Sequence, residues 1–131
     1  MSARDLAFRW LIAFVITQVV ECAVYTRGFG VRLGVAFGAS AITHPVVCFV
    51  IPKLWEAMYL AAILRGAGEL SPTAYFVTYG ALAESFAVVV EAFYLLRVAR
   101  LAPRRALLAS VAANAASGLT GLACSYLLGY P

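Results

Sequence analysis

Four apolar stretches, each long enough to cross a bilayer, constrain the fold of this chain more than any other feature. They cover about residues 6–26, 31–51, 73–96 and 106–128, and short segments with charges, glycine or proline separate them. A membrane span needs roughly 20 mostly apolar residues. Because 64% of the 131 residues are hydrophobic and only 12% are charged, little chain remains for a soluble domain. The sequence predicts an all-α membrane protein, a four-transmembrane-helix bundle in which residues 1–131 form a single integral membrane domain.

Basic residues at the ends of these stretches predict the orientation of the chain. One group flanks the first and third turns: Arg27, Arg32, Arg97, Arg100, Arg104 and Arg105. A smaller group falls on the opposite side: Arg4, Arg9, Lys53 and Arg65. Because basic residues accumulate on cytoplasmic loops, both turns are expected in the cytoplasm and both termini outside. We expect an integral protein of a bacterial inner (plasma) membrane whose arginines contact anionic lipids of the bilayer, and no nucleic acid.

The segment between the second and third stretches predicts an interfacial amphipathic helix. Over about residues 53–65, apolar residues recur along one helical stripe, while Lys53 and Glu56 lie nearer the other face. Pro52 precedes this segment, and a glycine-containing stretch follows it. The alternative is one long, proline-kinked second helix over residues 31–64.

An internal repeat is indicated by residues 19–27 and 89–97, which read VVECAVYTR and VVEAFYLLR. A shift of 70 residues without gaps aligns four pairs of polar residues: Glu21 with Glu91, Arg27 with Arg97, Ser40 with Ser110, and His44 with Asn114. The pattern predicts two tandem helical hairpins in parallel repeat, at about residues 6–51 and 73–128, an arrangement known among transporters. Chance similarity in a chain rich in alanine and valine is the alternative explanation.

Five polar side chains are predicted at membrane depth and form the candidate site for a proton, a cation or a substrate: Glu21, His44, Glu84, Glu91 and Asn114. At about 1.5 Å per helical residue, Glu21 and Glu91 lie roughly 9 Å inside the arginines. Glu84 and His44 lie roughly 20 and 18 Å inside. We therefore expect two polar layers, with Glu84, His44 and Asn114 near the midplane. Because an ionised group at the bilayer centre costs on the order of 2.5 to 3.5 kcal/mol, these side chains should face the bundle or a water-filled cavity.

Four further residues are predicted to support this site. Gln18 shares a helical stripe with Glu21, and Tyr25 and Tyr94 follow their glutamates at a spacing that allows a hydrogen bond. Anchoring at the membrane interface is the other explanation of the two tyrosines. Pro45 cannot donate a backbone hydrogen bond, so it frees a carbonyl oxygen near the only histidine, either as a ligand or as a kink that fits the bundle.

The sequence contains no motif of an enzyme that we can name. One histidine excludes the paired Glu-x-x-His of di-iron sites and the His-Glu-x-x-His of metalloproteases, and neither a Gly-x-Ser-x-Gly elbow nor a P-loop occurs. No cofactor is predicted. A single metal ion bound by His44, Glu84 and Glu91 stays open, although no spacing demands it.

The acids at membrane depth suggest two functions. The first is proton- or cation-coupled translocation of a small solute, in which Glu21 and Glu91 alternate between protonated and ionised states. The second is a structural or accessory subunit of a larger membrane complex, in which protonated acids hydrogen-bond the helices together. Because four helices enclose a narrow interior, a homodimer or a larger complex is the expected assembly.

Overall fold

The computed structural model describes residues 3–128, and nearly all of them are helical. Four helical stretches are long and apolar enough to cross a membrane: Ala7–Gly28, Leu33–Leu64, Pro72–Arg97 and Pro103–Leu127. No strand occurs within the described residues. The predicted all-helical class with four long apolar helices is therefore confirmed.

The first hairpin consists of two long helical stretches that each contain a π-helical turn. Helix α1 covers Ala3–Ala23 and continues directly into η1, Val24–Gly28. The second stretch consists of α2, Leu33–Pro45, η2, Val46–Val50, and α3, Ile51–Leu64. A π-helical turn is wider than an α-helical one and is often found at functional sites.

The second helical stretch has no break at Pro52. This proline lies in the first turn of α3, where its missing N–H is tolerated, and η2 begins directly after Pro45. The structure thus has the long second helix that the sequence offered as the alternative. The helix expected over residues 53–65 is its last part, and the boundary expected at residue 51 lies inside it. A helix of 32 residues is about 48 Å long, which exceeds a hydrocarbon core of about 30 Å. Placement of its end at a membrane interface stays a prediction.

The second hairpin consists of α4, Pro72–Arg97, and α5, Pro103–Leu128. The side chain of Ser71 accepts a hydrogen bond from the backbone N–H of Ala74 at 3.2 Å and so caps α4. Pro72 occupies the first turn, where its fixed φ suits a helix. Neither helix contains a π-helical turn.

The turns of the two hairpins have the same backbone geometry. In the first, Gly30 has φ +70°, and the N–H of the next residue donates to the carbonyl of Tyr25 at 3.0 Å. In the second, Arg100 has φ +56°, and the N–H of the next residue donates to the carbonyl of Leu95 at 3.3 Å. Each residue of the second turn lies 70 positions after its counterpart. The left-handed conformation suits glycine but is unusual for arginine.

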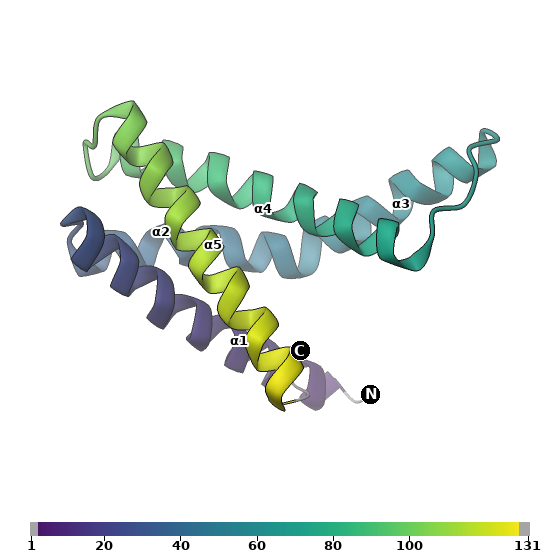
Figure 1. The fold of residues 1–131 in the computed structure, drawn as a ribbon, viewed down its shortest axis with the longest axis horizontal. Coiled ribbons are helices and arrows are strands. Elements are labelled where there is room, and N and C mark those ends of the chain that lie inside the picture. Colours follow the sequence, from purple (N-terminus) through teal and green to yellow (C-terminus); the bar gives the residue numbers. More distant parts are fainter. Residues whose placement is uncertain (1–2, 129–131) are drawn as a thin grey trace.

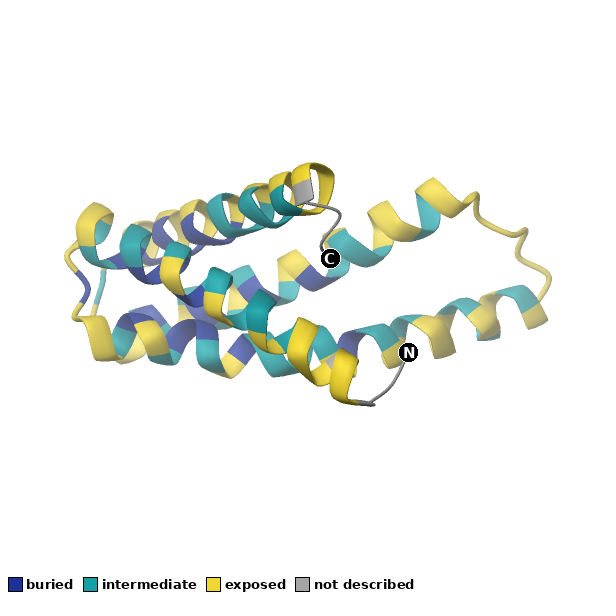
Figure 2. Ribbon diagram, turned by 90° about the horizontal axis from the view of Figure 1, so that it is seen from below, coloured by how far each residue is buried: buried dark blue, intermediate teal, exposed yellow. Residues whose placement is uncertain are grey.

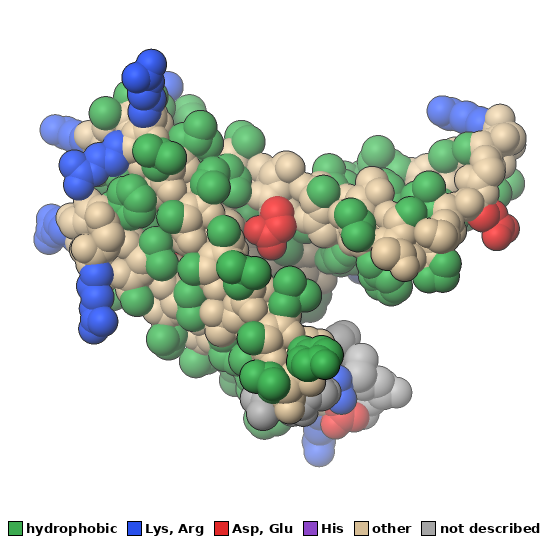
Figure 3. All heavy atoms as spheres, in the orientation of Figure 1, with side chains coloured by type: hydrophobic (Ala, Val, Ile, Leu, Met, Phe, Trp, Pro, Cys, Tyr) green, Lys and Arg blue, Asp and Glu red, His purple; other side chains and the backbone are tan. Residues whose placement is uncertain are grey.

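Both turns lie at one end of the molecule, and from there the helices separate into two arms (Figure 1). We call this the arginine end, after six exposed residues: Arg27, Arg32, Arg97, Arg100, Arg104 and Arg105. Their blue side chains gather at that end in Figure 3. One arm contains α1 packed on α5, and the other contains α3 and the start of α4. The start of α1 and the end of α5 therefore lie together, away from the turns.

The buried core lies near the arginine end, where all four long helices meet (Figure 2). Small residues line it: Ala36 and Ala39 on α2, and Ala106, Ala109 and Ala113 on α5. Small side chains let helix backbones approach closely, which favours helix association in a membrane. Tyr25 and Leu95, which lie 70 residues apart, are both fully buried in this core.

Candidate functional site

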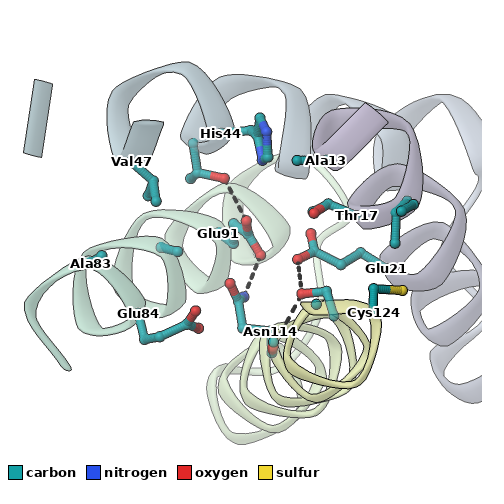
Figure 4. A pocket seen from close by; sticks show the side chains of 16 residues that line it. Ala13, Thr17, Glu21, His44, Val47, Ala83, Glu84, Glu91, Asn114 and Cys124 are labelled. Carbon is teal, nitrogen blue, oxygen red and sulfur yellow. Dashed lines mark hydrogen bonds between the residues drawn. The ribbon is translucent and has the colours of Figure 1, made fainter. Parts of the chain in front are cut away.

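Glu91 is the centre of a buried hydrogen-bond network that connects all four long helices. Its carboxylate accepts a hydrogen bond from the hydroxyl of Tyr25 on η1 at 2.5 Å and from that of Thr43 on α2 at 2.6 Å. The side-chain amide of Asn114 on α5 donates to it at 2.7 Å (Figure 4). Only 1% of Glu91 is exposed. One side chain of α4 therefore connects its own helix to the other three.

Glu21 on α1 is held in the same region by two serines. The hydroxyl of Ser40 on α2 donates to one carboxylate oxygen, and that of Ser117 on α5 donates to the other at 2.6 Å. Ser117 also lies 3.1 Å from the backbone carbonyl of Asn114, which is itself bonded to Glu91. Glu21 is 2% exposed, so both carboxyl groups lie in one buried polar cluster.

A π-helical turn positions the donor that crosses between the hairpins. Tyr25 lies in η1, one helical turn after Glu21, yet its hydroxyl bonds to Glu91 of the other hairpin. Tyr94, in the corresponding region of α4, makes no such bond. A Cβ placed on Gly38 would lie 2.5 Å from the Tyr94 hydroxyl oxygen, so this tyrosine packs against the glycine backbone of α2.

A cavity of about 240 Å³ extends from this network away from the arginine end. Glu21, Glu91 and Asn114 lie at its inner end, and His44 and Glu84 line its walls (Figure 4). Side chains of α1, α2, α4 and α5 all contribute to the lining. Because a water molecule occupies about 30 Å³ in the liquid, a space of this size suits a hydrated cation or a small solute.

His44 does not pair with Glu84, although the sequence placed both near the midplane. Its Nε2 lies 3.5 Å from the Cys48 sulfur, and its ring packs on Phe14 with centroids 5.2 Å apart. No hydrogen bond or ion pair joins Glu84 to any described residue. His44 thus lines the cavity with a ring that packs on Phe14, and Glu84 lines a separate part of the cavity.

Asn114 departs from the two predicted layers. It was expected with His44 and Glu84, but the structure places its amide on Glu91. The expectation counted residues from the arginines as though all helices were upright. Helix α5 instead runs obliquely to α2 and α4 (Figure 1), and the side chains of Asn114 and Glu91 meet in a hydrogen bond.

The other predicted supporting residues have different surroundings. Gln18 is buried; its Oε1 accepts a weak hydrogen bond from the Cys22 thiol at 3.8 Å, and its Nε2 has no partner among the described residues. It does not line the cavity. Pro45 ends α2, and η2 follows at once, which agrees with its missing backbone donor.

Three hydroxyl donors of the network were not predicted as part of the site: Ser40, Thr43 and Ser117. A signal was present in the spacing, because Ser40 and Thr43 are three residues apart, as are Asn114 and Ser117. Residues at that spacing share one face of a helix. In the structure, these two polar faces turn toward Glu21 and Glu91.

The described residues contain no group of three histidine, cysteine, aspartate or glutamate side chains that is suited to a metal ion. The geometry therefore gives no support to a metal bound by His44, Glu84 and Glu91. Comparisons of the chain with protein-family models, with curated proteins and with solved structures found no match.

Proposed function

We propose that this chain is an integral protein of a bacterial inner membrane that couples a proton or cation to the translocation of a small solute. The observation that carries the proposal is a pair of buried carboxyl groups, one from each hairpin, beside a cavity of about 240 Å³. Intramembrane carboxyls facing a cavity mark ion pathways and proton relays in many membrane proteins. The cavity is the proposed solute site.

The bonds of Glu91 supply the coupling. When ionised, this carboxylate accepts from Tyr25, Thr43 and Asn114 at once. When protonated, the carboxyl group carries an O–H that itself needs an acceptor. One of its oxygens is then less available as an acceptor, so one of the three donors loses its hydrogen bond to Glu91. Because these donors come from the other three long helices, protonation changes which helices are held together. Opening and closing of the two arms is the movement that this change would drive.

The proposed function is supported by a proposed duplication of the hairpins. In six pairs of residues separated by 70 positions, both members are buried: Glu21 and Glu91, Tyr25 and Leu95, Ala36 and Ala106, Ala39 and Ala109, Ser40 and Ser110, and Thr43 and Ala113. The matching φ values in the two turns are independent of side-chain composition. In transporters built from repeats, the site lies between the repeats, which move against each other.

The second candidate function is a structural or accessory subunit of a larger membrane complex. The same network favours this role, because the hydrogen bonds of Glu21 and Glu91 join different helices and would stabilise a fixed arrangement of the bundle. Interhelical hydrogen bonds in membranes contribute about 0.6 to 2 kcal/mol each. In this role, a neutral amide in place of the carboxyl would preserve much of the protein's behaviour.

Flux through purified protein in proteoliposomes separates the two candidates. An internal pH dye reports proton movement under an imposed potassium or pH gradient, for the parent, Glu91→Gln and the control Glu56→Gln. Glu56 lies on α3 and does not line the cavity, so its variant should match the parent. Transport predicts flux in the parent that Glu91→Gln abolishes without unfolding. Absence of flux from a well-folded parent would favour the accessory role.

A further inference from the structure

Glu84 differs from the two networked glutamates. It lies on α4, thirteen residues and therefore roughly 20 Å before Arg97, yet it is exposed and has no hydrogen-bond or ion-pair partner within residues 3–128. An ionised carboxylate at such depth in a bilayer is costly without a counter-charge. No lysine or arginine of the described chain supplies one.

A second hollow lies beside Glu84, on the outer face between α4 and α5. This lateral groove has a volume of about 1120 Å³ and is mostly apolar, with Phe76 and Tyr79 on the α4 side and Leu119 and Leu122 on the α5 side. Phe76, Leu119 and Leu122 are 68%, 68% and 69% exposed, so the groove opens sideways. Glu84 lines both this groove and the inner cavity. It therefore stands where the two spaces meet.

Glycines keep the groove open. Gly80 on α4 and Gly121 on α5 both line it, and a Cβ built on either would meet nothing within 4 Å. Neither glycine is thus needed for the two helices to approach each other. Glycine inside a helix is less favourable than alanine. The helices are therefore less stable at these two positions, where a side chain would narrow the groove. At Gly118, a Cβ would lie 3.7 Å from a carboxylate oxygen of Glu84.

We propose that the lateral groove binds a lipophilic cation, that is, an amine or a quaternary onium ion with an apolar body, whose charge pairs with Glu84. The apolar lining suits the body of such a molecule, and the unpaired carboxylate supplies the complementary charge. The face of Tyr79, which also lines the groove, offers a second attraction for a cation. This ligand class would reach the groove from the lipid phase and pass Glu84 into the inner cavity.

This inference adds a ligand class to the proposed function. Passage of the cation into the cavity depends on the proposed translocation, whereas binding in the groove does not. The probe is radiolabelled tetraphenylphosphonium, measured by equilibrium binding to the purified full chain in phosphatidylcholine nanodiscs. We expect saturable binding in the parent. Glu84→Gln should weaken it at least tenfold through loss of charge, and Gly121→Leu should do so by filling the groove.

Two variants are matched controls. Gly34→Leu adds the same side chain at a helical glycine of α2 that has open space and lies outside the groove. Glu56→Gln removes a carboxyl that also lies outside it. Both should bind like the parent, and thermal unfolding must show that all four variants fold. Absence of saturable binding in the parent, or binding unchanged by both Glu84→Gln and Gly121→Leu, would overturn the proposal.

The remaining outcomes separate this proposal from the proposed function. Binding that depends on Glu84, with no proton flux in the parent, would keep the groove as a cation site and reject translocation. Flux that depends on Glu91, with no binding of the probe, would keep translocation and reject the lipophilic ligand. A parent that is dimeric but made monomeric by Gly121→Leu, without cation binding, would assign the groove to an interface between two copies and also overturn the proposal.

Discussion

The two hairpins place a glutamate at the same position of their first helix, but they surround it differently. Glu21 is held by two serine hydroxyls, whereas Glu91 accepts from a phenol, a threonine and an amide. The phenol belongs to Tyr25, whose counterpart 70 residues later is Leu95. Only the first hairpin contains π-helical turns within the described residues. Two similar hairpins thus hold acids that bond to different numbers of helices. Glu91 bonds to all three other long helices, whereas Glu21 bonds to α2 and α5.

The largest expected effect of a single substitution is that of Glu91→Ala. It removes the acceptor that three side chains share. The Tyr25 hydroxyl keeps no other acceptor among the described residues, and a buried unsatisfied group costs about 1 to 3 kcal/mol, whereas Thr43 and Asn114 keep only carbonyls of their own helices, at 3.2 and 3.0 Å. Because three bonds between helices are lost as well, we expect a loss of about 3 kcal/mol in the free energy of unfolding, measured by SDS titration with circular dichroism. A variant as stable as the parent would show that Glu91 does not hold the helices together.

Glu21→Ala tests whether the two acids contribute unequally to stability, because one donor to Glu21 has another acceptor nearby. It removes the acceptor of only two hydroxyls, and Ser117 already lies near the backbone carbonyl of Asn114. We expect a loss of about 1 to 2 kcal/mol in the same titration. If Glu21→Ala proved as damaging as Glu91→Ala, the two acids would be equivalent and the contrast between the hairpins would fail.

Tyr25→Phe tests the bond that crosses between the hairpins. It removes one of three donors to Glu91, and a hydrogen bond to a charged group is worth about 1.5 to 3 kcal/mol. We expect a loss near the lower limit, about 1.5 kcal/mol, because two donors remain. Tyr94→Phe is the matched control, since its hydroxyl has no hydrogen bond among the described residues and should change stability little. Equal effects at both tyrosines would contradict the assignment.

The smallest expected effect concerns the turns, where the hairpins agree in backbone but not in sequence. Gly30→Ala places a Cβ at φ +70°, which costs about 1 kcal/mol, whereas Arg100→Gly relieves a non-glycine residue at φ +56° and should stabilise by a similar amount. Gly28→Ala is the control, because it has neither a positive φ nor a neighbour within 4 Å. Thermal unfolding of the three variants decides the signs, and a stabilising Gly30→Ala would contradict the shared turn geometry.

Much of the fold was predictable because apolar length is a strong constraint. The four long helices followed from hydropathy, and Ser71 with Pro72 marked the start of α4. The continuity of the second helix was not predictable from Pro52, because a proline is tolerated in a first helical turn as readily as after a helix end. The direction of α5 relative to the other helices leaves no trace in the sequence, so the hydrogen bond of Asn114 to Glu91 was not predicted.

The glutamates of the site were predictable, but most of their partners were not. A carboxyl in an apolar helix is rare enough to attract attention at once. Serine and threonine are not, because in helices they commonly bond to a carbonyl of the preceding turn. Thr78 and Thr120 do so here, whereas Thr43 also reaches Glu91. Only the packing of the helices distinguishes these cases.

The two turns also divide the same number of residues in different ways. Helix α2 begins at Leu33 and α5 at Pro103, 70 residues later, but η1 ends at Gly28 while α4 ends at Arg97. Relative to a shift of 70 residues, the helix before the turn thus ends one position later in the first hairpin than in the second, and the next helix begins at the same position. Under the proposed duplication, ancestral copies diverged here by substitution alone, without insertion or deletion. Asymmetry at the site would then have evolved while the register between residues 21–43 and 91–113 stayed intact.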